Sequence, residues 1–125
     1  MIIVKTFIII GSLSALIAVA LGAFAAHALK ARLTTEMMNT FEVGVRYHLV
    51  HSLAIFIVAW IALQYPDASI QVSGWLFTAG ILLFSGSLYA MGITGMTWLG
   101  AITPFGGMCF LAGWAWMGWR IWKLH

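Results

Sequence analysis

The chain of 125 residues is long enough for one domain, and 63% of its residues are hydrophobic while only 7% are charged. Because soluble domains carry about 25% charged residues, this composition excludes a surface that faces water and predicts one that faces lipid. The net charge of +3 comes from scattered basic residues beside apolar runs, which indicates membrane anchors and no nucleic-acid partner. The seven Trp residues suit a membrane–water boundary.

Four apolar segments divide the chain, at approximately residues 6–26, 44–63, 72–91 and 99–122. Each is close to the roughly 20 residues that a helix needs to cross a bilayer. The links after the second and third segments are short, and short links place neighbouring helices antiparallel. The sequence therefore predicts an all-α fold, an integral membrane four-helix bundle with up-down-up-down order, in a single transmembrane domain over residues 1–125.

The first segment also has features of a secretory signal. Lys5 precedes an apolar run, and Ala26-His27-Ala28 has the small-residue pattern of a cleavage site. The apolar run is nevertheless long enough to cross the bilayer, so we expect a retained transmembrane helix. At the other end of the chain, His125 is expected to be solvated.

The longest connection, residues 27–43, has two interpretations. Three apolar residues recur there at four-residue spacing among charged residues, which is typical of an amphipathic helix lying at the membrane interface. Alternatively, the second transmembrane helix begins early and extends out of the bilayer. Thr34, or Asn39 together with Glu42, could cap a helix start in this stretch. The three apolar residues are Leu29, Leu33 and Met37.

A group of polar residues lies at one predicted membrane face, where the first helix ends and the second and fourth begin. Ionisable groups inside a bilayer are costly, so they are candidates for function. His51 follows Gly44 by seven residues, which places it roughly 10 Å along the second span. The candidate polar cluster consists of His27, Glu42, Arg46, Tyr47, His48, His51 and Thr103.

Helical spacing predicts how part of this cluster is arranged. Tyr47 and His51 are four residues apart and share a face, and His48 nearly shares it. Glu42 precedes Arg46 by four residues, which is the favourable order for an ion pair on a helix. These spacings allow one polar stripe that points into the bundle.

Three interpretations of the cluster remain open. It could be a hydrogen-bond network that joins the first two helices, or the lining of a cavity for a proton, an ion or a small ligand, since histidine titrates near neutral pH. Ligation of a metal or haem by His27, His48 or His51 ranks last, because no ligand motif of specific spacing is present. No catalytic residue, metal or cofactor is therefore assigned, and Ser85 and Ser87 are expected to bond to their own helix.

These observations favour a non-enzymatic protein that is structural or accessory, or a small subunit of a membrane assembly. The alternative is a small channel or transporter that uses the polar cluster. The expected partners are membrane lipid and either further copies of the chain or a larger complex. Small residues at regular spacing in the first and fourth segments, such as Gly106 and Gly113, would allow close helix packing, within one chain or between copies.

The sidedness signal is weak, because three basic residues fall on each predicted side of the membrane. Lys and Arg are enriched on the cytoplasmic side of membrane proteins. If Arg46 is partly buried and counts less, both termini are favoured in the cytoplasm. The side with the termini holds Lys5, Arg120 and Lys123, and the other side holds Lys30, Arg32 and Arg46.

Four ordered motifs resemble a known family. Residues 22–29 read GAFAAHAL, residues 41–54 begin with Phe-Glu and end with Leu-Ala, residues 84–89 read FSGSLY, and residues 99–107 contain LGAITP followed by a Gly pair. Together they cover nearly the whole chain. They resemble the family known as domain of unknown function 423, whose animal members are called transmembrane protein 256.

This resemblance implies a small multi-pass protein of a bacterial inner membrane, and it implies no biochemical activity. The sequence departs from the family pattern at Ala25, where Gly is expected, and His48 lies outside the pattern. The resemblance directs attention to four residues at motif positions, which are His27, Tyr47, His51 and Thr103.

Overall fold

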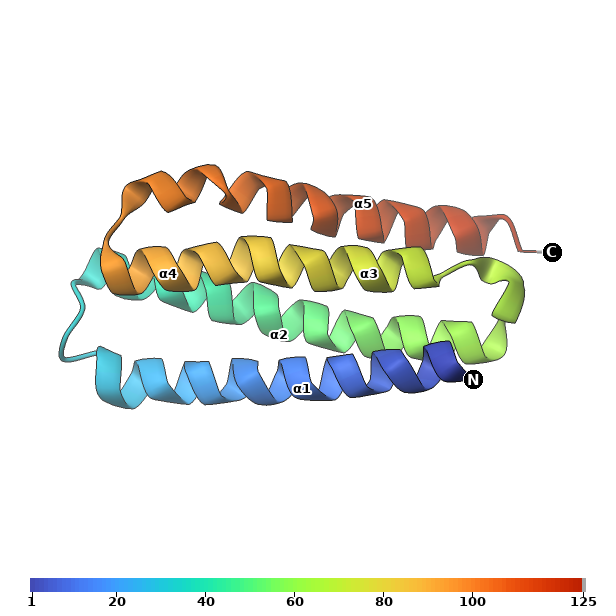
Figure 1. Cartoon of the computed structure of the whole chain (residues 1–125), viewed down its shortest axis with the longest axis horizontal. Coiled ribbons are helices and arrows are strands. Elements are labelled where there is room, and N and C mark those ends of the chain that lie inside the picture. Colours follow the sequence, from blue (N-terminus) through green and yellow to red (C-terminus); the bar gives the residue numbers. More distant parts are fainter. Residues whose placement is uncertain (125) are drawn as a thin grey trace.

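The computed structural model describes residues 1–124 and consists of four long helices, so the all-α prediction is confirmed (Figure 1). All four are long and apolar enough to cross a membrane. His125 lies outside the described residues. The α-helical elements are α1 (Ile2–Phe24), α2 (Thr35–Gln64), α3 (Gln71–Gly80), α4 (Gly86–Thr94) and α5 (Thr103–Trp122). The π-helical turn η1 (Ala25–Leu29) extends α1, and a second one, η3 (Ile81–Ser85), joins α3 to α4. Two 3₁₀ turns, η2 (Pro66–Ala68) and η4 (Thr97–Ala101), lie before α3 and before α5.

The helices run up, down, up and down, in the predicted order (Figure 1). The N-terminus, the α2–α3 connection and the end of α5 lie at one end of the molecule, and the α1–α2 and α4–α5 connections lie at the other. Each helix contains the span predicted for it and extends beyond that span. Pro104 lies in the first turn of α5, where its missing N–H removes no helical bond.

The bundle is an open row rather than a closed square. α1 packs on α2, α2 packs on the continuous α3–η3–α4 helix, and α5 packs on α3 and η3. No substantial contact joins α1 to α5 within residues 1–124. Consequently the inner helices are more buried than the outer ones. In the most apolar stretch of each helix, 44% of α2 and 39% of α3–α4 is buried inside the protein, compared with 17% of each outer helix.

The connection between α1 and α2 contains no separate interfacial helix, and α2 begins early, as the second of the two interpretations predicted. α2 begins at Thr35, and the extended Thr34 accepts a hydrogen bond of 3.1 Å from the backbone N–H of Met37. This bond satisfies one of the free donors at the helix start. Of the three apolar residues, Leu29 of η1 is buried against Met38 and Phe41 of α2, and Leu33 and Met37 are partly buried.

Glycines bring α5 into close contact with the inner helices. A methyl group added at Gly106 would overlap the backbone of Phe84, and one added at Gly113 would lie 2.6 Å from the ring of Phe77. The inner helix also has such a glycine: Gly80 of α3 accommodates the ring of Phe110 from α5. The small residues of the fourth span therefore provide packing within the chain, one of the two predicted uses.

Candidate functional site

The predicted polar cluster contains two separate sites, one on each side of α2. His48 and His51 are both buried, with 4% and 3% of their surface exposed. Residues three apart on a helix differ by about 60° around its axis, which is enough to place them between different neighbours. His48 faces α1 and α4, whereas His51 faces α5. The prediction of a single stripe is therefore wrong.

His48 belongs to a chain of hydrogen bonds that joins three helices. Its Nδ1 lies 2.7 Å from the Tyr89 hydroxyl of α4, and its Nε2 lies 3.0 Å from the Ser14 hydroxyl of α1. Ser14 lies 2.6 Å from the Ser52 hydroxyl, which donates to the backbone carbonyl of His48 at 2.8 Å. The chain thus starts at α4, passes through the imidazole to α1, and returns to α2.

The donor and the acceptor of every bond in this chain can be assigned by starting from its last bond, in which Ser52 donates to the carbonyl of His48. A serine has one O–H, and that of Ser52 is used on a carbonyl that can only accept. Ser14 must therefore donate to Ser52 and accept from the Nε2–H of His48. In the neutral imidazole, Nδ1 is then an acceptor and Tyr89 donates to it. All four hydrogens are used inside the protein.

His51 has the opposite tautomer. Its Nδ1 lies 2.8 Å from the backbone carbonyl of Tyr47, so this nitrogen carries the hydrogen. Its Nε2 accepts from the indole N–H of Trp114 at 3.1 Å, and an indole can only donate. Both ring nitrogens are therefore occupied in a neutral imidazole. The ring also stacks on Phe110, with centroids 3.5 Å apart and planes 8° from parallel.

The remaining predicted residues lie away from the two imidazoles or at the surface. Four are exposed, and within residues 1–124 none of their side-chain polar atoms bonds to the histidines. Thr103 is partly buried at the start of α5 and lies 2.6 Å from the Ser87 hydroxyl of α4. Tyr47 contributes its backbone carbonyl to His51 and packs its ring against Phe84. The exposed residues are His27, Glu42, Arg46 and Tyr47.

Several bonding partners were not predicted as site residues, because each is a single small or aromatic residue in an apolar run. Ser85 was expected to bond to its own helix, but it donates across to the carbonyl of Gly44 at 2.8 Å. Ser87 does bond within its helix, to the carbonyl of Phe84. Hydroxyl and indole groups inside predicted spans are the signal that would have found the others. These are Ser14, Ser52, Ser73, Tyr89 and Trp114.

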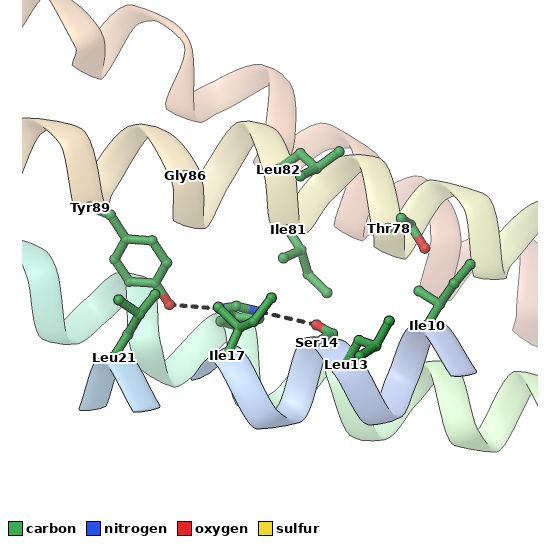
Figure 2. Close-up of a pocket in the computed structure, with 11 residues that line it drawn as sticks. Ile10, Leu13, Ser14, Ile17, Leu21, Thr78, Ile81, Leu82, Gly86 and Tyr89 are labelled. Atoms are coloured by element: carbon green, nitrogen blue, oxygen red, sulfur yellow. Dashed lines mark hydrogen bonds between the residues drawn. The ribbon is translucent and has the colours of Figure 1, made fainter. Parts of the chain in front are cut away.

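A cavity of about 370 Å³ lies between α1 and the α3–η3–α4 helix, beside the His48 chain (Figure 2). Its walls are mostly aliphatic side chains from the two facing helices, and Tyr89 and Ser14 contribute hydroxyl groups. Leu13, Ile17 and Leu82 line it and are also exposed on the outer surface. The cavity therefore opens sideways, in the direction of the bilayer.

The polar interior is fully bonded. Within residues 1–124, every buried side-chain nitrogen and oxygen atom has a hydrogen-bond partner. In the same part of the chain, no three His, Cys, Asp or Glu residues are grouped closely enough to hold a metal ion. The arrangement thus holds three helices together at His48 and two at His51, and it leaves neither imidazole with a free nitrogen.

Comparison with known proteins agrees with this picture. The model of the family described as "Protein of unknown function (DUF423)" matches residues 21–107. The chain is 46% identical over 111 residues to the UPF0382 membrane protein YwdK of Bacillus subtilis, which covers 88% of this chain and 90% of that protein. It is 41% identical over 110 residues to the UPF0382 membrane protein SH2409 of Staphylococcus haemolyticus, a match that covers 88% of this chain and 89% of that protein. No solved structure matches the chain.

Proposed function

Since the chain belongs to the DUF423 family, we propose that this multi-pass membrane protein is a non-enzymatic accessory protein, which associates with other membrane proteins through its outer helices. The observation that carries the proposal is the complete internal bonding of the polar residues. A general base or a metal ligand needs a free ring nitrogen, and both nitrogens of each imidazole are already bonded: those of His48 to α1 and α4, and those of His51 to α5 and to its own helix.

The open row of helices supports association with a partner. α1 and α5 do not close on each other, so each keeps a broad apolar face on the outside of the molecule. On α5 this face includes Ala112, Ala115 and Gly118, and nothing lies within 4 Å of a methyl group added at Gly118. Small residues permit close approach of a neighbouring helix in a membrane.

The alternative is a small channel or transporter. Transport of a proton or ion needs polar groups along a path from one side of the membrane to the other. The cavity beside His48 opens sideways and is lined mainly by aliphatic residues, and the hydrogen-bond chain ends on a backbone carbonyl of its own helix. These features favour the accessory role over transport.

Native mass spectrometry after extraction in a mild detergent tests the proposal. We expect a stable assembly, either of several copies or with a partner protein, that is weakened by Ala115→Trp on the outer face of α5. Phe105→Ala, also exposed but at the start of the helix, is the matched control. A strictly monomeric protein, or a proteoliposome flux abolished by His51→Ala in a folded variant, would contradict the accessory role.

For the location we propose a bacterial inner membrane. The relatives named above are bacterial membrane proteins, which supports this location. The preference for cytoplasmic termini depended on Arg46 being partly buried, but Arg46 is exposed, so three basic residues count on each side and neither orientation is favoured. Labelling of single cysteines placed at residues 5 and 31, in a protein with Cys109→Ala, with a membrane-impermeant maleimide distinguishes the two orientations.

A further inference from the structure

The cavity beside His48 has the dimensions of a site for one hydrocarbon chain. Its volume of about 370 Å³ is near the lower end of the range for small-molecule sites, about 300–1,000 Å³. It extends along α1 from Ile10 to Leu21, which corresponds to roughly 16 Å at about 1.5 Å per residue. Both walls are visible in Figure 2, with α1 on one side and Ile81 and Leu82 on the other.

The polar groups of this cavity present only hydrogen-bond acceptors. Tyr89 donates its hydrogen to His48, and Ser14 donates its hydrogen to Ser52. Thr78, the other hydroxyl in the wall, donates to the carbonyl of Gly74 at 2.8 Å. Tyr89 and Thr78 keep both acceptor sites of their hydroxyl oxygens, and Ser14 keeps one because it already accepts from His48.

From this pattern we infer that the cavity binds a membrane-soluble long-chain alcohol, whose hydroxyl donates to Tyr89 or Ser14 while its chain lies between α1 and α3–α4. The ligand must be the hydrogen-bond donor, because the hydroxyl groups of the cavity already donate their hydrogens to other residues. An ether or ketone of the same size has only acceptors, and it would face the lone pairs of the wall without a bond.

The position of the cavity selects against charged lipids. Ser14 and His48 lie near the middle of the long helices Ile2–Leu29 and Thr35–Gln64, far from either membrane surface. Among residues 1–124, no Lys, Arg, Asp or Glu lines the cavity. A charged headgroup at this depth would remain unpaired in a medium of low polarity, which is costly. A single hydroxyl can reach the same depth because Tyr89 and Ser14 replace its bonds to water.

Photolabelling in lipid nanodiscs tests the inference with the full-length protein. The probe is tetradecyl alcohol with a diazirine in its chain, and the competitors are unlabelled tetradecyl alcohol, its methyl ether and tetradecane. We expect labelled residues on α1 and α3–α4, and competition by the alcohol about tenfold stronger than by the ether, which corresponds to about 1.4 kcal/mol. Equal competition by all three compounds would overturn the inference.

A variant that fills the cavity provides the first control. Gly86 lines the cavity, and a methyl group added there meets nothing closer than 4.0 Å, so Gly86→Leu can place its side chain in the cavity without a clash. We expect this variant to fold and to lose the specific labelling. Gly118→Leu, in equally open space on α5, should keep it. Labelling that persists in folded Gly86→Leu would overturn the inference.

A second variant tests the hydrogen-bond pattern itself. Ser14→Ala removes the acceptor of the His48 Nε2–H, so the cavity gains a free donor. The preference of the cavity for the alcohol over the ether should then fall by about tenfold, to near equality, if one hydrogen bond decides it. Because the ligand can also donate to Tyr89, the same measurement is made with Tyr89→Phe. A preference that is unchanged in both variants would show that the hydroxyl of the ligand does not meet this chain and would overturn the inference.

Discussion

The two outer helices are attached to the inner pair in different ways. α5 is attached mainly by interlocking shapes, since glycines on α3 and α5 accommodate aromatic rings and backbone of the opposite helix. α1 is attached partly by a directed chain of hydrogen bonds, and it leaves a cavity against α3–α4. The cavity beside α1 is bordered by the hydroxyl groups of Ser14 and Tyr89, whereas a hollow of about 520 Å³ beside α5 is bordered mainly by aromatic and aliphatic side chains and by His51. We expect mutations on the two sides to differ accordingly.

The largest effect is expected at the closest contact of α5. Gly106→Leu would drive a side chain into the backbone of Phe84, which cannot be moved aside like the end of a flexible side chain. We expect α5 to lose its docked position and the protein to lose its cooperative thermal transition in detergent, measured by circular dichroism. Gly118→Leu on the same helix meets open space and should melt like the wild type.

The next effect concerns the ring on which His51 stacks. Phe110→Ala removes this stacking and leaves Gly80 without its filling partner. Such a change costs about 3–5 kcal/mol in soluble cores, and we expect about 2 kcal/mol here because lipid, not water, solvates the separated helices. Unfolding in sodium dodecyl sulfate measures it. Phe105→Ala, with the ring 65% exposed, is the control, and equal losses in both variants would contradict the interlocking described for α5.

A smaller loss is expected on the α1 side. Ser14→Ala breaks the bonds to His48 and Ser52, and hydrogen bonds in membranes contribute about 0.6 kcal/mol each on average. We expect about 1 kcal/mol in the same unfolding assay. Ser12→Ala, exposed on the same helix, should change nothing. If Ser14→Ala cost as much as Phe110→Ala, the distinction between the two sides would fail.

The smallest effect is expected for the single bond between α2 and α5. Trp114→Phe keeps an aromatic ring but removes the indole N–H that His51 accepts. We expect a loss of about 0.6 kcal/mol, because the packing of α5 remains. An independent readout is the ¹⁵N chemical shift of His51 Nε2, which should change when its donor is removed. Trp122→Phe, 83% exposed, should leave this shift unaltered.

The sequence predicted the parts of the fold that depend on neighbouring residues. The four spans follow from apolar length, and Thr34 was one of the two cap candidates that residue type and spacing gave. The two π-helical turns were not predicted, since a turn that is wider by one residue leaves no mark in hydropathy. The partners of the buried histidines were missed as well. Ser14 precedes His48 by 34 residues, and Trp114 follows His51 by 63.

The sequence by itself determined that this protein is a four-helix membrane protein, because hydrocarbon accepts only segments that are apolar and internally hydrogen-bonded over its full thickness. Only the tertiary structure decided that His48 and His51 serve different interfaces. The two side chains differ by a rotation of about 60° around α2. This rotation gives them different partners, because one imidazole reaches Ser14 of α1 and the other reaches Trp114 of α5. The same placement of α1 created the cavity and directed the acceptors of Tyr89 and Ser14 toward it.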